Sequence, residues 1–130
     1  MKKILFLSLI GLISITSAYA ACEGGTMVGD FCKSNKSMNW WSAYSWCKAN
    51  GMHLATMYEM CPSWDGNTGS GKCPELNGKL SVSDYTNDVW SATVSGSEYA
   101  FAVNPSNGDV SRDGIRYYSR HMISYFAFCR

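Results

Sequence analysis

The chain has 130 residues, a formal net charge of +1 and six cysteines. Its near-neutral charge argues against a nucleic-acid-binding protein, whose interface would need a basic patch. The length suffices for one domain with one modest hydrophobic core, and the sequence shows no internal repeat and no block of like charges.

The first twenty residues are typical of a secretory signal peptide. Lys2 and Lys3 precede an apolar run over residues 4–15, and Ala18 and Ala20 are the small residues of a cleavage site. The run is too short to span a bilayer of about 30 Å, and no later segment comes close. We predict a signal peptide at 1–20, one mature domain at 21–130, no transmembrane segment, and a secreted, periplasmic or cell-surface location.

Residues 19–22, Tyr-Ala-Ala-Cys, also have the shape of a lipoprotein cleavage box. Tyr19 stands where that box normally has an aliphatic residue, so signal-peptide cleavage without lipidation is favoured. Without Lys2 and Lys3 the mature chain keeps 9 basic residues against 10 acidic ones, a net charge of −1.

An even number of cysteines in a small exported chain indicates a disulfide framework, although six cysteines allow 15 pairings. A zinc site is disfavoured because no Cys-x-x-Cys pair occurs and only two histidines are available. A catalytic thiol is also disfavoured, because an exported thiol among five others is normally oxidised.

The first half of the mature chain predicts a hairpin and two helices. The segment between Cys22 and Cys32 suits a β-hairpin closed by a disulfide. Asn39 can cap a helix over residues 40–50, which Gly51 would end. Thr56 can cap a short second helix, with Glu59 at the spacing of a capping box.

Residues 62–88 are rich in Gly, Ser, Asn, Asp and Pro and predict a long loop region, which Cys61 and Cys73 would tie together. The last third predicts strands over 89–94, 98–103, 109–113 and 123–129. Turn signals separate these strands at Ser95-Gly96, Asn107-Gly108 and Asp113-Gly114. Helices followed by an antiparallel sheet indicate the α+β class.

One set of residues resembles the C-type lectin-like domain over most of residues 31–130. The set is Trp40-x-x-Ala43-x-x-x-Cys47-x-x-x-Gly51-x-x-Leu54-Ala55, then Glu59, and a cysteine near the end of the last strand. The resemblance implies two helices packed on antiparallel sheets, a long loop region and disulfide staples. It implies disulfides between Cys47 and Cys129 and between Cys22 and Cys32, which leaves Cys61 for Cys73.

The sequence departs from the calcium-dependent members of that family. Their sugar site uses Glu-Pro-Asn or Gln-Pro-Asp in the long loop and Trp-Asn-Asp on a late strand, oxygen ligands that suit a hard cation, and neither motif is present here. The family's Trp-Ile-Gly-Leu motif and its usual partner cysteine before the final one are also absent. We therefore expect no metal and no other cofactor.

The C-terminal half is similar to bacterial exported lectin-like domains, namely the Fibrobacter-type major paralogous domains and the variable proteins of diversity-generating retroelements. The residues that carry this similarity are Trp90-Ser91-Ala92-Thr93, Tyr99-Ala100, Asn107-Gly108, Arg112 and Phe128-Cys129-Arg130. The similarity implies a calcium-free face that binds a protein or a glycan ligand, as in adhesion.

We predict ligand contacts from a basic and aromatic segment, because Arg and Tyr couple a large contact area to directed hydrogen bonds. The predicted residues are Arg112, Arg116, Tyr117, Tyr118, Arg120 and His121, with Trp64 as either a stacking platform or a loop anchor. A solvated role for the arginines is the alternative. Trp40, Trp41, Trp46 and Trp90 are expected mostly in the core.

No motif indicates an enzyme. Asp109 and Asp113 could resemble a glycosidase pair, but the turns that flank a strand explain them as well. Enzymes with a lectin-like fold, notably the formylglycine-generating family, are far longer than this chain. We predict a non-catalytic bacterial binding module. A small structural subunit of a surface fibre or envelope assembly, with self-assembly or an envelope partner, is the second hypothesis.

Overall fold

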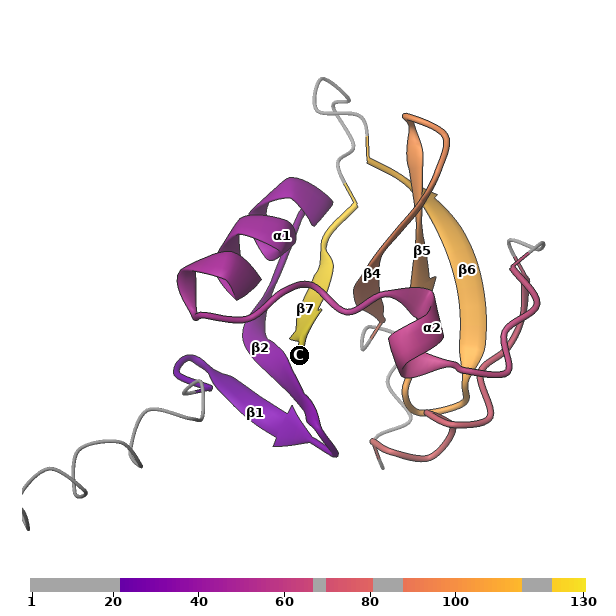
Figure 1. Cartoon of the computed structure of the whole chain (residues 1–130), viewed down its shortest axis with the longest axis horizontal. Helices are drawn as coiled ribbons and strands as arrows, with labels where there is room; N and C mark the ends of the chain where they lie inside the picture. The colour runs from indigo at the N-terminus through magenta and orange to yellow at the C-terminus, as the bar shows by residue number, and fades with distance from the viewer. Residues whose placement is uncertain (1–21, 67–69, 81–87, 116–122) are drawn as a thin grey trace, which may run out of the picture.

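The computed structural model describes residues 22–66, 70–80, 88–115 and 123–130, and the predicted signal peptide lies outside these ranges. Within them, the chain forms one seven-stranded sheet and two short helices (Figure 1). None of the described helices is long and apolar enough to cross a membrane. The elements are β1 Gly25–Val28, β2 Phe31–Met38, α1 Trp40–Ala49, α2 Met57–Met60, β3 Ser70–Lys72, β4 Val89–Ser95, β5 Tyr99–Val103, β6 Asp109–Gly114 and β7 Tyr125–Cys129.

The sheet is mixed, with the strand order β1-β2-β7-β4-β5-β6-β3. Neighbouring strands run antiparallel except β4 and β7, which run parallel and meet at Val89 and Phe126. The predicted antiparallel arrangement is therefore wrong for this pair. The alternation of side chains between the two faces is the same in both directions along a strand, so the pattern identified the strands without their direction.

Four elements from the two ends of the described chain form what we call the terminal clasp: β1, β2, α1 and β7. Disulfides join Cys22 to Cys32 and Cys47 to Cys129, and Cys32 and Cys129 are opposite partners in the β2–β7 ladder. This is the pairing that the resemblance implied. The predicted N-terminal hairpin is also confirmed, with β1 paired to β2.

Helix α1 begins at the predicted residue and ends one residue earlier than predicted, at Ala49. The Asn39 side chain accepts a hydrogen bond from the Ser42 backbone N–H at 2.8 Å. Ala43 and Cys47, one helical turn apart, are both fully buried and face the sheet. Gly51 follows the helix with a φ of +76°, a left-handed conformation that glycine adopts without steric cost.

The predicted capping box of α2 is confirmed. The Thr56 hydroxyl accepts from the Glu59 N–H at 3.1 Å, and a Glu59 carboxylate oxygen accepts from the Thr56 N–H at 2.9 Å. Partial burial raises the pKa of Glu59, but hydrogen bonds from Thr56 and His53 outweigh it and leave the pKa below its usual value. The Met57 N–H donates to the Thr93 hydroxyl at 2.8 Å, which fixes α2 on β4.

The region predicted as a long loop contains a short strand. β3 pairs antiparallel with β6, with Ser70 opposite Ser111 and Lys72 opposite Asp109. A disulfide joins Cys61 to Cys73, which ties the start of this region to the end of β3. The composition of β3 gives no strand signal. The strand forms because the edge of β6 supplies the backbone partners that hold it extended.

The strands of the last third match their predicted positions with small differences. The Asp113-Gly114 turn signal was wrong, because Gly114 pairs with Tyr99 as the last residue of β6. Strand β5 is buried on both faces after Tyr99, its first residue. Phe101 and Val103 pack into one hydrophobic cluster, whereas Ala100 and Ala102 pack into the other.

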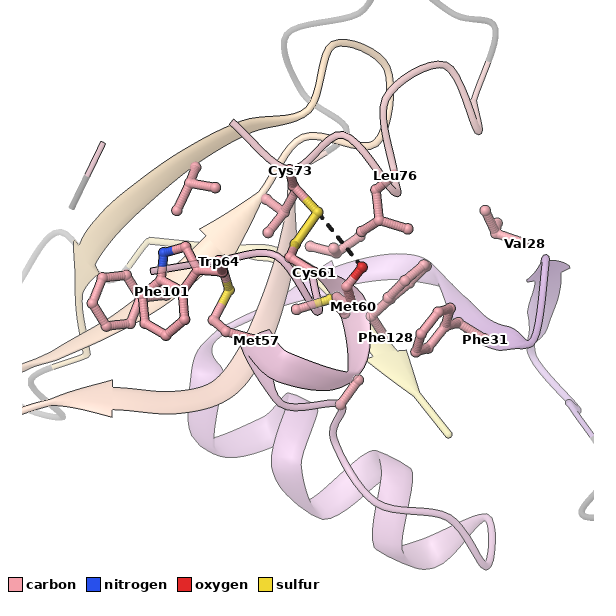
Figure 2. Packing of buried hydrophobic residues seen from close by; sticks show 14 residues of the cluster. Val28, Phe31, Met57, Met60, Cys61, Trp64, Cys73, Leu76, Phe101 and Phe128 are labelled. Atoms are coloured by element: carbon pink, nitrogen blue, oxygen red, sulfur yellow. Dashed lines mark hydrogen bonds between the residues drawn. A yellow bond between two sulfur atoms is a disulfide. The ribbon is translucent and has the colours of Figure 1, made fainter. Parts of the chain in front are cut away.

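The first cluster lies between the sheet and the segment that includes α2 and the Cys61–Cys73 disulfide (Figure 2). Phe31 of β2 and Phe128 of β7 stack there, with ring centroids 4.7 Å apart and planes 17° apart. The second cluster lies under α1 and contains Trp40 and Trp90. The two clusters hold both sides of the sheet in place and fix which side chains reach the surface.

Candidate binding surface

Of the seven residues predicted to bind ligand, two lie in the described part of the chain, Arg112 and Trp64. Arg112 is exposed on β6. Trp64 is buried, close to the Cys61–Cys73 disulfide. The other five predicted residues lie outside the described residues: Arg116, Tyr117, Tyr118, Arg120 and His121.

Arg112 contacts residues of β5 and β4. Its guanidinium carbon lies 5.1 Å from the centre of the Tyr99 ring, and its Nη1 donates to the Ser95 hydroxyl at 3.5 Å. Tyr99 itself is 41% exposed. Arg112 is paired with Phe101, and Ser95 with Tyr99, so these side chains share one face of β4, β5 and β6. We call Ser95, Tyr99 and Arg112 the arginine face.

The Arg112 guanidinium lies over the Tyr99 ring in a cation–π contact, and the Arg112 side chain is exposed. A contact of this kind is worth about 0.5–1 kcal/mol at an exposed site. The guanidinium fork suits planar acceptors such as carboxylates, and the tyrosine adds apolar area with a hydroxyl tip. This combination matches the chemistry for which the sequence singled out Arg112.

Trp64 has the packing of a loop anchor. Its ring is 8% exposed and forms edge contacts with Tyr58 on one side, at 5.3 Å, and Phe101 on the other, at 4.8 Å. Little of the ring is available to stack on a sugar. Tyr58 is the exposed member of this row, at 56%. The Trp64 indole N–H makes no hydrogen bond to the described residues, and its packing shows no role for that group.

A polar hollow of about 430 Å³ was missed by the sequence analysis. Its polar lining is Asp88, Asn104, Asn107, Asp109 and Ser111, drawn from the start of β4, from β6 and from the turn between β5 and β6. The sequence predicted a turn at Asn107, a strand over Asp109 and Ser111, and a loop that ends at Asp88. The signal that could have located the hollow is the density of Asn and Asp at the ends of three neighbouring strands.

Negative charge is concentrated behind this hollow. Burial, together with the nearby charge of Asp113, raises the pKa of Asp88 to about 6, and a hydrogen bond with Asn104 lowers it in part. Asp113 accepts hydrogen bonds from the Ser111 hydroxyl at 2.7 Å and the Tyr125 hydroxyl at 3.0 Å. Burial and Asp113 also raise the pKa of Tyr125 above its usual value.

Several oxygens of the hollow already have partners. The Asn104 Oδ1 accepts from the Ser106 N–H, and the Asn107 Oδ1 accepts from the Asp109 N–H, each at 2.9 Å. The Asp109 carboxylate is paired with the Lys72 ammonium. Carboxylate and amide oxygens are the ligands that calcium prefers, but here the amides stabilise turns of the protein itself.

The Asp109 and Asp113 pair does not have glycosidase spacing. The two residues are four apart on one strand, which separates their backbones by about 13 Å. Glycosidases hold their two carboxyl groups about 5–9.5 Å apart. Asp109 pairs with Lys72, and Asp113 accepts a hydrogen bond from Tyr125, so each carboxylate has its own partner within the protein.

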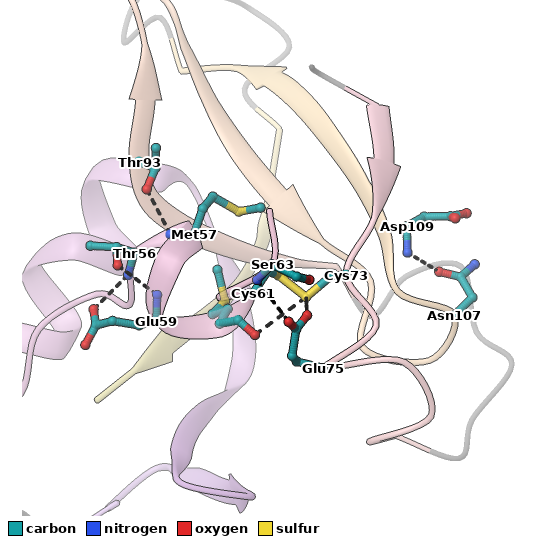
Figure 3. Close-up of a disulfide and its surroundings, with 11 residues drawn as sticks. Thr56, Met57, Glu59, Cys61, Ser63, Cys73, Glu75, Thr93, Asn107 and Asp109 are labelled. Carbon is teal, nitrogen blue, oxygen red and sulfur yellow. Dashed lines mark hydrogen bonds between the residues drawn. A yellow bond between two sulfur atoms is a disulfide. The ribbon is translucent and has the colours of Figure 1, made fainter. Parts of the chain in front are cut away.

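The Cys61–Cys73 disulfide lies beside a carboxylate (Figure 3). The Glu75 Oε2 is 4.0 Å from the Cys73 sulfur, and its Oε1 accepts from the Ser63 N–H at 3.0 Å. A hydrogen bond from the Ser63 side chain is the main reason that the pKa of Glu75 lies below its usual value, and backbone N–H groups of Glu75 and Ser63 also lower it. The two sulfurs and the carboxylate are close enough together to hold a metal ion. Bonded to each other, however, the sulfurs offer no thiolate, the form of cysteine that binds metals.

Helix α1 presents an aromatic surface that the sequence analysis placed mostly in the core. Trp41 is 46% exposed and Tyr44 is 41% exposed, whereas Trp40, whose ring contacts both of theirs, is 8% exposed. The core expectation is therefore wrong for Trp41. The aromatic residues of α1 do not all lie on one helix face, and the buried residues of the helix are Trp40, Ala43 and Cys47.

No protein-family model matches the chain, and no curated protein matches it either. The interpretation of these surfaces rests on their own geometry.

Proposed function

We propose that the protein is an exported, non-catalytic binding module with a calcium-independent lectin-like fold, which recognises a protein or glycan ligand at the bacterial surface. The observation that carries this proposal is the arginine face. It presents an exposed cation and an exposed ring on paired strands, with Arg112 over Tyr99 at 5.1 Å. Side chains fixed on rigid strands lose little conformational entropy when a ligand binds.

Two further observations support the proposal. Three disulfides are typical of proteins that work in an oxidising compartment outside the cytoplasm. In the polar hollow, Asn104 and Asn107 already accept backbone hydrogen bonds, and Lys72 pairs with Asp109, so a calcium ion would have to compete with these partners. Recognition through the arginine face needs no metal.

The first test is a binding survey. The oxidised mature domain is applied to an array of glycans and bacterial surface proteins, once with calcium and once with a chelator. We expect binding to a defined ligand in both buffers. Binding that disappears with the chelator would contradict calcium independence, and binding to nothing in either buffer would contradict the recognition function.

A second candidate function, a small subunit of a surface assembly, is favoured by one observation. Strand β1 lies at an edge of the sheet, and its Met27 is 55% exposed. An edge strand offers unpaired backbone groups to another chain. Sedimentation of the oxidised domain separates the two functions: a stable monomer supports the binding module, and concentration-dependent polymers that Met27→Lys abolishes support the subunit.

A further inference from the structure

The exposed face of α1 has the form of a ligand platform rather than of an ordinary solvated helix. Trp41 and Tyr44 are three positions apart and expose nearly half of their surface. Both rings rest on the buried ring of Trp40. The Trp41 ring meets it edge-on at 4.9 Å, and the Tyr44 ring is tilted over it at 5.6 Å. An exposed aromatic pair supported from below by a third ring is a rigid surface.

A hydrogen bond further restricts the Trp41 ring. Its indole N–H donates to the Ile115 carbonyl oxygen at 2.8 Å, which links α1 to the end of β6. The polar group of the side chain is therefore used inside the protein, and the exposed part of the ring is carbon. Because the ring is already oriented, a ligand that stacks on it does not bear the cost of ordering it.

The platform is cationic at its C-terminal end. The Lys48 ammonium lies 5.6 Å from the centre of the Tyr44 ring. Residues 40–49 include no acidic side chain. In the described part of the chain the two ion pairs are formed by His53 with Glu59 and by Lys72 with Asp109, so Lys48 takes part in neither. A ligand that covers Tyr44 would place an anionic group within reach of this ammonium.

The exposed area of the platform suits a sugar better than a protein partner. An aromatic side chain buries about 150–250 Å² when fully covered, so two half-exposed rings offer roughly 200 Å². A stable protein interface needs about 800 Å² on each partner. A sugar ring, by contrast, covers one aromatic ring, and it adds hydroxyl groups that can reach polar side chains such as Ser45, exposed on the same helix.

We propose that Trp41, Tyr44 and Lys48 form a second, calcium-free site for an acidic glycan, with one sugar ring stacked on Trp41 and the next, acidic ring against Tyr44, its carboxylate paired with Lys48. This site is separate from the arginine face, so it does not depend on the ligand of that face. Each sugar ring supplies a C–H face to one aromatic ring, and the Lys48 ammonium supplies the selectivity for an acid over its neutral ester.

The test is calorimetric titration of the oxidised mature domain with oligomers of galacturonate, glucuronate and N-acetylneuraminate. The methyl esters of the same oligomers are the neutral comparison. We expect at least one acid to bind and its ester to bind at least fivefold more weakly. Affinity for the acid should fall as salt is added, because the contribution of Lys48 is screened. No binding to any of the three acids, or equal binding of acid and ester, would overturn the proposal.

Three variants assign the binding to the platform. Trp41→Ala should weaken binding at least tenfold, and Tyr44→Ala, which removes no hydrogen bond described for this ring, should weaken it several-fold. Lys48→Ala should reduce the affinity for the acid to that of the ester. Tyr58→Ala is the matched control, because this tyrosine is also exposed but lies on α2. Unchanged binding by Tyr44→Ala and Lys48→Ala, or an equal loss in Tyr58→Ala, would contradict the assignment.

Discussion

The terminal clasp and the strands β4, β5 and β6 are held by different forces. Two disulfides, Cys22–Cys32 and Cys47–Cys129, join elements within the clasp. The other three strands contain no cysteine, and they are held by the strand ladder and by the packing of residues such as Phe101 and Val103. They also carry the arginine face and the carboxylates beside the polar hollow.

The two parts should therefore respond to different conditions. A change of redox state acts on the clasp, where distant parts of the chain are bonded. A change of pH acts on β4 to β6, where burial and the charge of Asp113 raise the pKa of Asp88. The arginine face therefore lies on strands β4 to β6, which are held by packing and strand pairing. The neighbouring terminal clasp is held by disulfides as well.

The largest effect should come from the clasp. Cys47→Ala with Cys129→Ala opens a bridge between residues 82 apart, whereas Cys61→Ala with Cys73→Ala opens one between residues 12 apart. Chain entropy predicts losses of about 4–5 and about 3 kcal/mol in the free energy of unfolding. Guanidinium unfolding of both double variants measures them. Equal losses, or a larger loss for the shorter loop, would show that the clasp is not the main covalent constraint.

A smaller and pH-dependent effect is expected at Asp88. Its pKa is raised from 3.8 to about 6 in the folded protein, so the folded state binds the proton more tightly than the unfolded state does. Stability is therefore highest below about pH 4 as far as this group is concerned, and it is lost as the pH rises through about 6. Because Asp88 is only half-buried, solvent screening limits the loss to on the order of 1 kcal/mol.

Asp88→Asn removes this titration and keeps an acceptor for the Asn104 amide. The variant should match the wild type at pH 4 and exceed its free energy of unfolding at pH 7.5. Urea unfolding at the two pH values measures the difference, and Asp30→Asn is a control, because Asp30 is an exposed carboxylate in the β1–β2 turn. A variant that is less stable than the wild type at pH 7.5 would contradict the raised pKa.

Much of the fold could be predicted because its signals are local. Asn39, Gly51 and the Thr56 and Glu59 pair act through backbone groups a few residues away, so they marked both helices. The alternating residues of β4, β5 and β6 likewise marked their strands. The parallel pairing of β4 with β7 could not be predicted in this way, because it depends on where a distant segment returns.

The candidate site was predictable only in part for the same reason. Arg112 was identified by its type, but Tyr99 and Ser95 become its neighbours only through strand pairing. Trp41 was expected in the core because of its position next to Trp40, but the helix directs Trp40 inward and leaves Trp41 exposed. The polar hollow gathers residues from three strand ends that are distant in sequence.

The measurement that tests the central claim most directly is the dissociation constant of the ligand found in the binding survey, measured in chelator for the wild type and for Arg112→Ala. We predict at least tenfold weaker binding, about 1.4 kcal/mol, with the free energy of unfolding changed by less than about 0.5 kcal/mol. Lys36→Ala, which removes an exposed cation from β2, should bind as the wild type does. An unchanged dissociation constant in Arg112→Ala would contradict recognition through the arginine face.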